Sequence, residues 1–374
     1  MISLAYQQWT SAPQEIELVK SFIVTHPGNE LRFWVENGRV HVGCDWWAYE
    51  RRTLLEEALP VHQPTYSKSS RVPYTKIPFA LRVHLNRARI AVLKVRAKDG
   101  GFPAGPVETS VDVFRRDLWA AACGLAGVTV QETPERQLVL THDLDEEFGW
   151  PGVGQLRQVE RSLGVVSATG VLSQRYTLPE SALLALVDEG CEIFSHGYLH
   201  DGTLAFLPAD ELRHRLGHFF EAYPSMRGVV RGFRAGQLVR SEHLFKHVAE
   251  VFEYDMTPPT TEIGGAHGWR TGCATTVPFI DNHGLPHLPL SITQDYFLQF
   301  IDRLSPEQIT ALWVKSTDAV WDAGGVAVHL IHPDNVRRKP QLLRAYRDYL
   351  EVVLDRGAVV RLPGEVMTSL GVSK

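Results

Sequence analysis

The chain has 374 residues, of which 44% are hydrophobic and 22% are charged, and its net charge is −5. This length exceeds the usual size of one domain, and the apolar content is enough for a large core. The weak negative charge and the lack of a Lys/Arg-rich block argue against a nucleic-acid-binding protein. No apolar run reaches the ~18 residues that cross a bilayer, and the first residues do not form a secretory signal.

Four cysteines lie far apart in the sequence and show no CxxC spacing, which is typical of reduced thiols in a reducing compartment. They are Cys44, Cys123, Cys191 and Cys273. We therefore expect a soluble, cytoplasmic protein without a transmembrane segment. Homo-oligomer formation stays open at this stage.

The first 135 residues do not show the regular alternation of strands and helices that follows in the rest of the chain. Alternating runs on either side of Asn37-Gly38 predict a β-hairpin. A basic stretch near 80–97 and the periodic stretch 110–124 predict helices, and the Gly- and Pro-rich segment 98–106 predicts a loop. We interpret residues 1–135 as a smaller α+β accessory region whose role the sequence does not give.

From residue 136 to the C-terminus at 374, strands alternate with amphipathic helices. The predicted strands are 137–141, 165–172, 191–195, 228–233, 326–331 and 358–362. The predicted helices are 155–163, 181–187, 210–223, 242–251, 306–321 and 342–354. This alternation is typical of βαβ units and a parallel sheet. The number of strands favours closure into an α/β barrel, so residues 136–374 are predicted to be the catalytic domain.

Polar residues that can do chemistry follow several of these strands. Asp143 and Asp145 end the first strand, and His196 and His200 follow the third. Arg234 follows the fourth strand, and His332 follows the strand at 326–331. In α/β barrels the carboxyl ends of the strands form one face, so we expect these side chains to converge.

The residue types at these positions are those of a catalytic metal site. Zinc-type ions bind imidazole and carboxylate ligands, which predicts Asp145, His196 and His200 as ligands. The two histidines face the same way if a helical turn begins at His196. The ion lowers the pKa of a bound water towards ~7, and Asp143 is left free to take its proton. His332 is the candidate acid for a departing amine nitrogen.

In combination these motifs resemble those of the polysaccharide deacetylases, carbohydrate esterase family 4. Thr141-His-Asp-Leu-Asp145 is similar to the family's first motif, Thr-Phe-Asp-Asp-Gly. His196-Gly-Tyr-Leu-His200 matches its His-Ser/Thr-x-x-His motif, and Leu330-Ile-His332 matches its Leu-x-His motif. The resemblance covers roughly residues 136–368. It implies a distorted, incomplete α/β barrel that removes N- or O-acetyl groups from sugars with the help of a divalent metal.

Residue roles follow from the resemblance. Asp143 would be the base, and Arg234, in Phe233-Arg-Ala-Gly236, would orient it although the family's Arg-x-Pro proline is missing. The fourth motif is the least similar, and Asp255 in Phe252-Glu-Tyr-Asp-Met256 would be the partner of His332. Zinc is the favoured metal, with cobalt, nickel or manganese as alternatives. The altered motifs leave the substrate open.

Other histidines have simpler interpretations. His142 and His329 are expected to stand outside the chemistry. His267, His283 and His287, in the irregular stretch 257–295, are expected to be solvated loop residues, although a loop there would be placed to cover the site.

These observations favour a metal-dependent hydrolase that removes an N-acetyl or other N-acyl group from an amino sugar or glycoconjugate precursor. One alternative is an amidohydrolase acting on a non-sugar linear or cyclic amide. A second alternative is a catalytically silent carbohydrate-binding or assembly protein that keeps the fold.

Overall fold

The computed structural model describes residues 22–26, 29–44, 77–96, 107–129, 135–260, 262–263 and 270–369. The predicted loop at 98–106 and His267 lie outside the described residues. No helix in the described ranges is both long and apolar enough to cross a membrane. The division of the chain near residue 135 stays a prediction.

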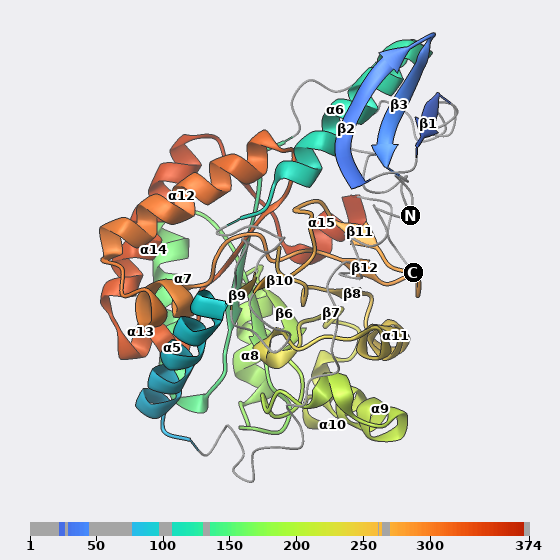
Figure 1. Ribbon diagram of the computed structural model, residues 1–374. Coiled ribbons are helices and arrows are strands. Elements are labelled where there is room, and N and C mark those ends of the chain that lie inside the picture. Colours follow the sequence, from blue (N-terminus) through green and yellow to red (C-terminus); the bar gives the residue numbers. More distant parts are fainter. Residues whose placement is uncertain are drawn as a thin grey trace.

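A small sheet near the N-terminus lies apart from the main sheet (Figure 1). Its strands are β1 (Ile23–Thr25), β2 (Asn29–Glu36) and β3 (Arg39–Cys44), in the order β1-β3-β2. The predicted hairpin is confirmed: Asn37 and Gly38 join β2 to β3 with φ angles of 50° and 69°. Both angles are positive, as the tight hairpin turn requires. Helix α6 (Ser110–Ala126) packs on this sheet, where Leu118 and Trp119 join Val42 in one buried cluster.

The main sheet curls into a distorted, incomplete barrel, which confirms the predicted fold class. Its nine strands run in the order β11-β12-β8-β7-β6-β5-β4-β13, with β14 also paired to β4. All neighbouring strands are parallel except β11, which is antiparallel to β12. The strands are β4 (Gln137–Asp143), β5 (Ala168–Val171), β6 (Glu192–Ser195), β7 (Gly232–Phe233), β8 (Tyr254–Asp255), β11 (Phe279–Ile280), β12 (Pro286–His287), β13 (Ala327–Leu330) and β14 (Val359–Val360).

Irregular chain covers the free edge of β13. The Ile292 N–H donates to the Val328 carbonyl at 3.1 Å, and the Ser291 hydroxyl donates to the Val326 carbonyl at 2.8 Å. The Val326 N–H in turn donates to the Thr276 carbonyl at 3.0 Å. A two-stranded ribbon, β9 (Glu262–Ile263) and β10 (Arg270–Thr271), belongs to the same stretch. Backbone groups that a closing strand would pair are therefore satisfied by a loop.

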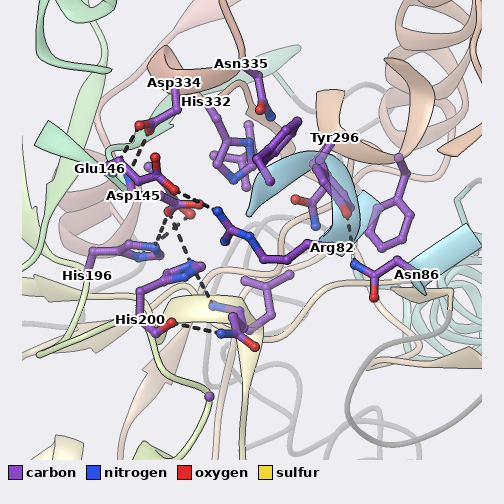
Figure 2. Close-up of a pocket in the computed structure, with 18 of the residues that line it drawn as sticks. Arg82, Asn86, Asp145, Glu146, His196, His200, Tyr296, His332, Asp334 and Asn335 are labelled. Atoms are coloured by element: carbon purple, nitrogen blue, oxygen red, sulfur yellow. Dashed lines mark hydrogen bonds and ion pairs between the residues drawn. The ribbon is translucent and has the colours of Figure 1, made fainter. Parts of the chain in front are cut away.

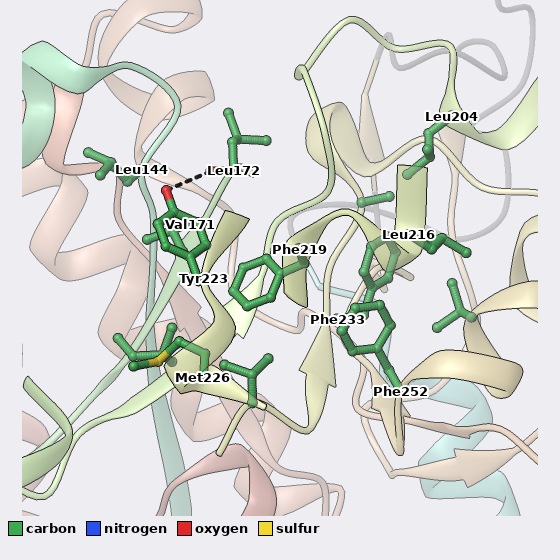
Figure 3. Close-up of a cluster of buried hydrophobic side chains, with 14 of the residues drawn as sticks. Leu144, Val171, Leu172, Leu204, Leu216, Phe219, Tyr223, Met226, Phe233 and Phe252 are labelled. Carbon is green, nitrogen blue, oxygen red and sulfur yellow. Dashed lines mark hydrogen bonds between the residues drawn. The ribbon is translucent and has the colours of Figure 1, made fainter. Parts of the chain in front are cut away.

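Helices cover the outside of the barrel in two groups (Figure 1). The first group packs against β4 and β13 through one large apolar cluster. It comprises α7 (Trp150–Ser162), α12 (Pro306–Asp322), α13 (Pro333–Arg338) and α14 (Gln341–Asp355). The second group shares another cluster with β5, β6 and β7, part of which Figure 3 shows. It comprises α8 (Glu180–Asp188), α9 (Ala209–Gly217), α10 (Phe219–Ala222) and α11 (Glu242–Val251).

Two further helices lie outside these groups. Helix α15 (Pro363–Ser369) contributes Val366 and Met367 to the cluster inside the barrel. Helix α5 (Phe79–Arg96) comes from the N-terminal region and lies beside α13 in Figure 1. Short 3-10 and π turns link the elements. They are η3 (Glu147–Gly149), η4 (Leu204–Phe206), η5 (Pro224–Met226), η6 (Gly236–Leu238) and η7 (Phe297–Ile301).

Alternation along β4 decides which of its side chains reach the interior of the barrel. Leu138 joins the outer helices, whereas Val139 belongs to the interior cluster. Because the side chains of a strand point to opposite faces in turn, Asp143 shares the interior side with Val139. His142 points outward, where its Nε2 lies 2.6 Å from a carboxylate oxygen of Glu160 on α7. His142 therefore packs between the sheet and the outer helices and does not point into the barrel.

The same alternation places His329 outside the cavity. Val328 and Leu330 of β13 belong to the interior cluster, so His329 faces the outer helices. Its ring stacks on Tyr349 at 4.8 Å and meets Trp313 edge-on at 4.4 Å. Burial lowers the pKa of His329 to about 3, so its imidazole is neutral and packs among aromatic side chains.

Candidate active site

Three side chains that can bind a metal meet at the carboxyl ends of β4 and β6. Oδ1 of Asp145 lies 3.3 Å from Nε2 of His196 and 3.2 Å from Nε2 of His200. One candidate ligand atom from each residue lies within 4.8 Å of the other two. Figure 2 shows the three side chains pointing toward one another at the edge of a cavity.

The local backbone at the two histidines differs from our expectation. We expected a helical turn to begin at His196, but the chain bends without forming a helix after β6. Gly197 has a φ of 90° and His200 a φ of 55°, so two left-handed residues bring the imidazoles together. Gly236 stands where the Arg-x-Pro motif has its proline. A Cβ there would lie only 2.7 Å from the His200 ring, so glycine leaves room for this histidine.

The protonation pattern of the three groups suits a cation. The Nδ1 of His196 lies 3.1 Å from the Arg234 carbonyl, which accepts the ring proton and leaves Nε2 with its lone pair. Among the described residues, neither that Nε2 nor Oδ1 of Asp145 has a hydrogen-bond partner, although both are buried. Burial lowers the pKa of His200 to about 4, so its imidazole is neutral, and its Nε2 accepts a hydrogen bond from the Gln237 N–H at 3.2 Å, a bond that a metal at this atom would replace. Two buried, unpaired acceptors side by side are what a metal ion would satisfy.

Asp143 is fixed by a buried ion pair, as expected for Arg234. Nη1 of Arg234 donates to Oδ1 of Asp143 at 3.0 Å and to Oγ1 of Thr141 at 2.9 Å. Burial raises the pKa of the Asp143 carboxyl, but the charge of Arg234 outweighs burial and holds the pKa below its usual range. Asp143 is thus an ionised carboxylate, and its Oδ2 is the oxygen not bound by Arg234.

His332 lies at the same cavity, but its partner is not the one we expected. Nδ1 of His332 donates to Oδ1 of Asp295 at 2.6 Å, and Asn335 Nδ2 donates to the other Asp295 oxygen at 3.0 Å. Burial alone lowers the pKa of His332, but the Asp295 carboxylate outweighs burial and raises the pKa to about 10. The predicted pairing of His332 with Asp255 is therefore wrong.

Strand alternation explains this correction. Tyr254 and Met256 belong to the interior cluster, so Asp255 between them points out of the barrel. There its carboxylate lies 2.9 Å from Nδ1 of His287, whose Nε2 lies 3.1 Å from Asp281. His287 is fully buried, which also contradicts its interpretation as a solvated loop residue. The two carboxylates outweigh the effect of burial and raise the pKa of His287 to about 9.

The pairing of His332 with Asp295 predicts a pH-dependent loss of stability in the metal-free protein. Because the pKa of His332 is raised in the folded state, its stabilising effect is fully present below about 6.5 and is lost as the pH rises through about 10. Urea unfolding at pH 6.5 and pH 10 should show this loss in the wild type. Asp295→Asn should reduce the difference between the two pH values, and an unchanged difference would contradict the pairing.

Several residues that build the cavity carry no signal in the sequence. Both oxygens of Asp334 accept backbone N–H groups, from Asp145 at 2.9 Å and from Glu146 at 3.0 Å, and so fix the chain at the candidate ligand. Asp334 follows His332 closely and could have been suspected, whereas Asp295 lies in irregular chain with no motif around it. Helix α5 also lines the cavity, with Phe79, Arg82, Asn86, Arg89 and Ile90.

Comparisons with known proteins establish the fold. No protein-family profile and no curated protein sequence matches the chain. A solved structure from Mycobacterium smegmatis, named as a polysaccharide deacetylase, is similar with a TM-score of 0.50 and 21% identity over 63% of this chain and 89% of that one. Puue allantoinase is similar with a TM-score of 0.50 and 13% identity over 63% of this chain and 90% of that one. This chain therefore has the fold of the polysaccharide deacetylases, and part of it has no counterpart in either structure.

Proposed function

We propose that this protein is a metal-dependent hydrolase that removes an N-acetyl or other N-acyl group from an amino sugar or glycoconjugate precursor. The observation that carries the proposal is that Asp145, His196 and His200 lie together beside two acid–base groups in opposite protonation states. Asp143 is held ionised, and His332 is held protonated, at the same cavity. Groups whose environments push their pKa values apart are typical of a base and an acid in one reaction.

Asp145, His196 and His200 would hold a divalent cation, for which zinc is the favoured candidate. When bound, such an ion polarises a carbonyl group and makes water a better nucleophile. The chain's own residues supply the rest of the chemistry. Oδ2 of Asp143 takes the proton of the attacking water, while Arg234 holds Oδ1 and fixes the direction of the carboxylate.

His332 protonates the leaving nitrogen. Its Nδ1 is engaged by Asp295, so Nε2 is the atom that delivers the proton. The Asp295 carboxylate keeps the imidazole protonated before the reaction and orients the ring. The departing group leaves as a neutral amine because an amide anion is a very poor leaving group.

Hydrolysis of a non-sugar linear or cyclic amide is the second candidate. The fold likeness to an allantoinase is as high as the likeness to the deacetylase. In either reaction Asp143 would act as the base and His332 as the acid. The two candidates differ in the product that is released, so one experiment separates them.

The test uses purified, metal-free protein that is reloaded with Zn²⁺ or Co²⁺. We expect acetate release from N-acetylglucosamine derivatives to depend on the added metal, to stop with a chelator and to return on reloading. Ring opening of a cyclic imide without acetate release would favour the second candidate. No turnover of either class by metal-saturated protein would support a catalytically silent binding protein and contradict our proposal.

A further inference from the structure

Helix α5 closes one side of the candidate active site, although it comes from the N-terminal region of the chain. Phe79, Arg82, Asn86 and Ile90 follow one another at spacings of three or four residues, so they lie on one face of the helix. All four line the cavity that also contains the candidate metal ligands. This face of α5, which we call the wall, therefore bounds the space around a substrate together with the barrel.

The wall is fixed to the turn η7 and the residue before it by polar and apolar contacts. The Phe79 ring packs edge-on against Phe300, with the ring centroids 5.0 Å apart. Asn86 Nδ2 donates to the Tyr296 hydroxyl at 2.9 Å, and Nε of Arg87 donates to the Phe300 carbonyl at 2.7 Å. These contacts are spread over about two turns of the helix, so they fix both its position and its direction.

Two further contacts join α5 to other elements of the site. Nη2 of Arg82 lies 2.9 Å from Oε1 of Glu146, the residue that follows the candidate ligand Asp145. The Arg338 guanidinium of α13 lies over the Phe79 ring, 4.2 Å from its centroid. The helix is therefore held at three places around the cavity, and its lining side chains stand at defined positions.

The wall stands on the side of the cavity where the leaving amine would be protonated. Tyr296, which Asn86 contacts, directly follows Asp295, the partner of His332. Figure 2 shows Asn86 and Tyr296 across the cavity from the two histidines that are candidate metal ligands. Because His332 delivers a proton to the leaving nitrogen, the part of the substrate attached to that nitrogen must lie near this side. The wall therefore limits the size of the amine part of the substrate.

The cavity itself is small. The centres of water-sized groups can occupy a volume of about 160 Å³ in it. One water needs about 10–15 Å³ by the same measure, so the cavity holds roughly ten to sixteen groups of this size. A single N-acetylated sugar has a comparable number of non-hydrogen atoms, whereas a disaccharide has far more. The cavity thus has room for one N-acylated unit and not for neighbours on both sides of it.

We propose that the site takes a single N-acylated unit, either a free small molecule or the end of a chain, and that helix α5 excludes units inside a polymer. A unit inside a polymer needs open space on both sides of the scissile amide, and α5 fills one of these sides. The inference rests on the proposed function, because it names the substrate class of the same site. It also gives part of the N-terminal region a role, which is to select substrates by size.

Two probes that carry the same amide test the inference: N-acetylglucosamine and its β-1,4-linked oligomer N-acetylchitopentaose. With metal-loaded protein we expect acetate release from the monosaccharide, and loss of acetyl groups from the oligomer at end units only. Mass spectrometry of the fragmented product locates the free amine. Equilibrium binding to metal-free protein gives a second measurement without turnover. The oligomer should bind at most about threefold more tightly than the monosaccharide, because only one of its units enters the cavity.

Two variants and one matched control assign the size limit to the wall. Phe79→Ala and Ile90→Ala both remove apolar volume from the wall. Each should permit loss of interior acetyl groups and tighten binding of the oligomer about tenfold relative to the monosaccharide, since further units gain contacts. Leu85→Ala, at an exposed position of the same helix, should discriminate between the probes as the wild type does. Melting temperatures identify the folded variants, because truncation of the buried Ile90 also destabilises the helix packing.

Four results would each overturn the inference. They are loss of interior acetyl groups with the wild type, binding of the oligomer about tenfold or more tightly than the monosaccharide, absence of binding by both probes, and folded wall variants that discriminate as the wild type does. Failure of the proposed function gives a different result. Neither probe would then release acetate, while the monosaccharide would still bind and the oligomer would bind no more tightly.

Discussion

Replacing Asp143 with asparagine should lower kcat by about 10²–10⁴-fold, the usual contribution of a general base, while metal binding is retained. The asparagine oxygen can still accept the hydrogen bond from Arg234, so the geometry is kept and the proton acceptor is lost. The measurement is kcat on the best substrate together with the metal content of the dialysed protein. Metal content near that of the wild type is part of the expected result.

The control for this variant is Asp188→Asn, the same chemical change at an exposed position at the end of α8. It should leave kcat unchanged. Because Asp143 pairs with a fully buried arginine, the melting temperature of Asp143→Asn must be measured as well. A folded Asp143→Asn protein with wild-type kcat would contradict the role of Asp143 as the base.

Replacing Asp145 with asparagine should weaken metal binding, which Asp143→Asn leaves intact. The variant should therefore no longer respond to added metal. Loss of an outer partner of a metal site costs 10–100-fold in affinity, so loss of a direct ligand should cost at least about 100-fold. In the wild type, Zn²⁺ at about 100 times its Kd should stabilise the fold by about 2.7 kcal/mol. Asp145→Asn should show little of this stabilisation in a thermal melt.

Asp143→Asn serves as the matched control for Asp145→Asn, because it makes the same change two residues away in the same strand end. It should keep the metal-dependent rise of the melting temperature. If both variants keep the rise, the metal does not bind between Asp145, His196 and His200. If both lose it, Asp143 is a ligand and the proposed division of roles is wrong.

Much of the site could be predicted because the relevant signals are local. Each of six site residues lies at the end of a strand or shortly after it: Asp143, Asp145, His196, His200, Arg234 and His332. Parallel strands place their carboxyl ends on one face, so a correct strand assignment was enough to bring these residues together. The bounds of the strands agree less well than their order: the predicted strand 228–233 is only Gly232–Phe233 in the structure.

The sequence could not predict the partner of His332, because that contact joins segments without regular structure. Asp295 lies in irregular chain that covers the edge of β13, and no periodicity indicates where such chain runs. Asp255 was the natural choice by motif order. Its position between two interior side chains excludes that pairing, and only the observed clusters show which residues face inward.

By itself, the sequence determined the βαβ order of the barrel and the residues at its strand ends, because hydrophobic periodicity and motif spacing are properties of short segments. Tertiary structure decided the partners of those residues and the wall that faces them. Asp295, Asp334 and the basic helix α5 reach the cavity across long separations in the chain. Such contacts depend on how loops and helices pack around the closed sheet, and no local pattern encodes that packing.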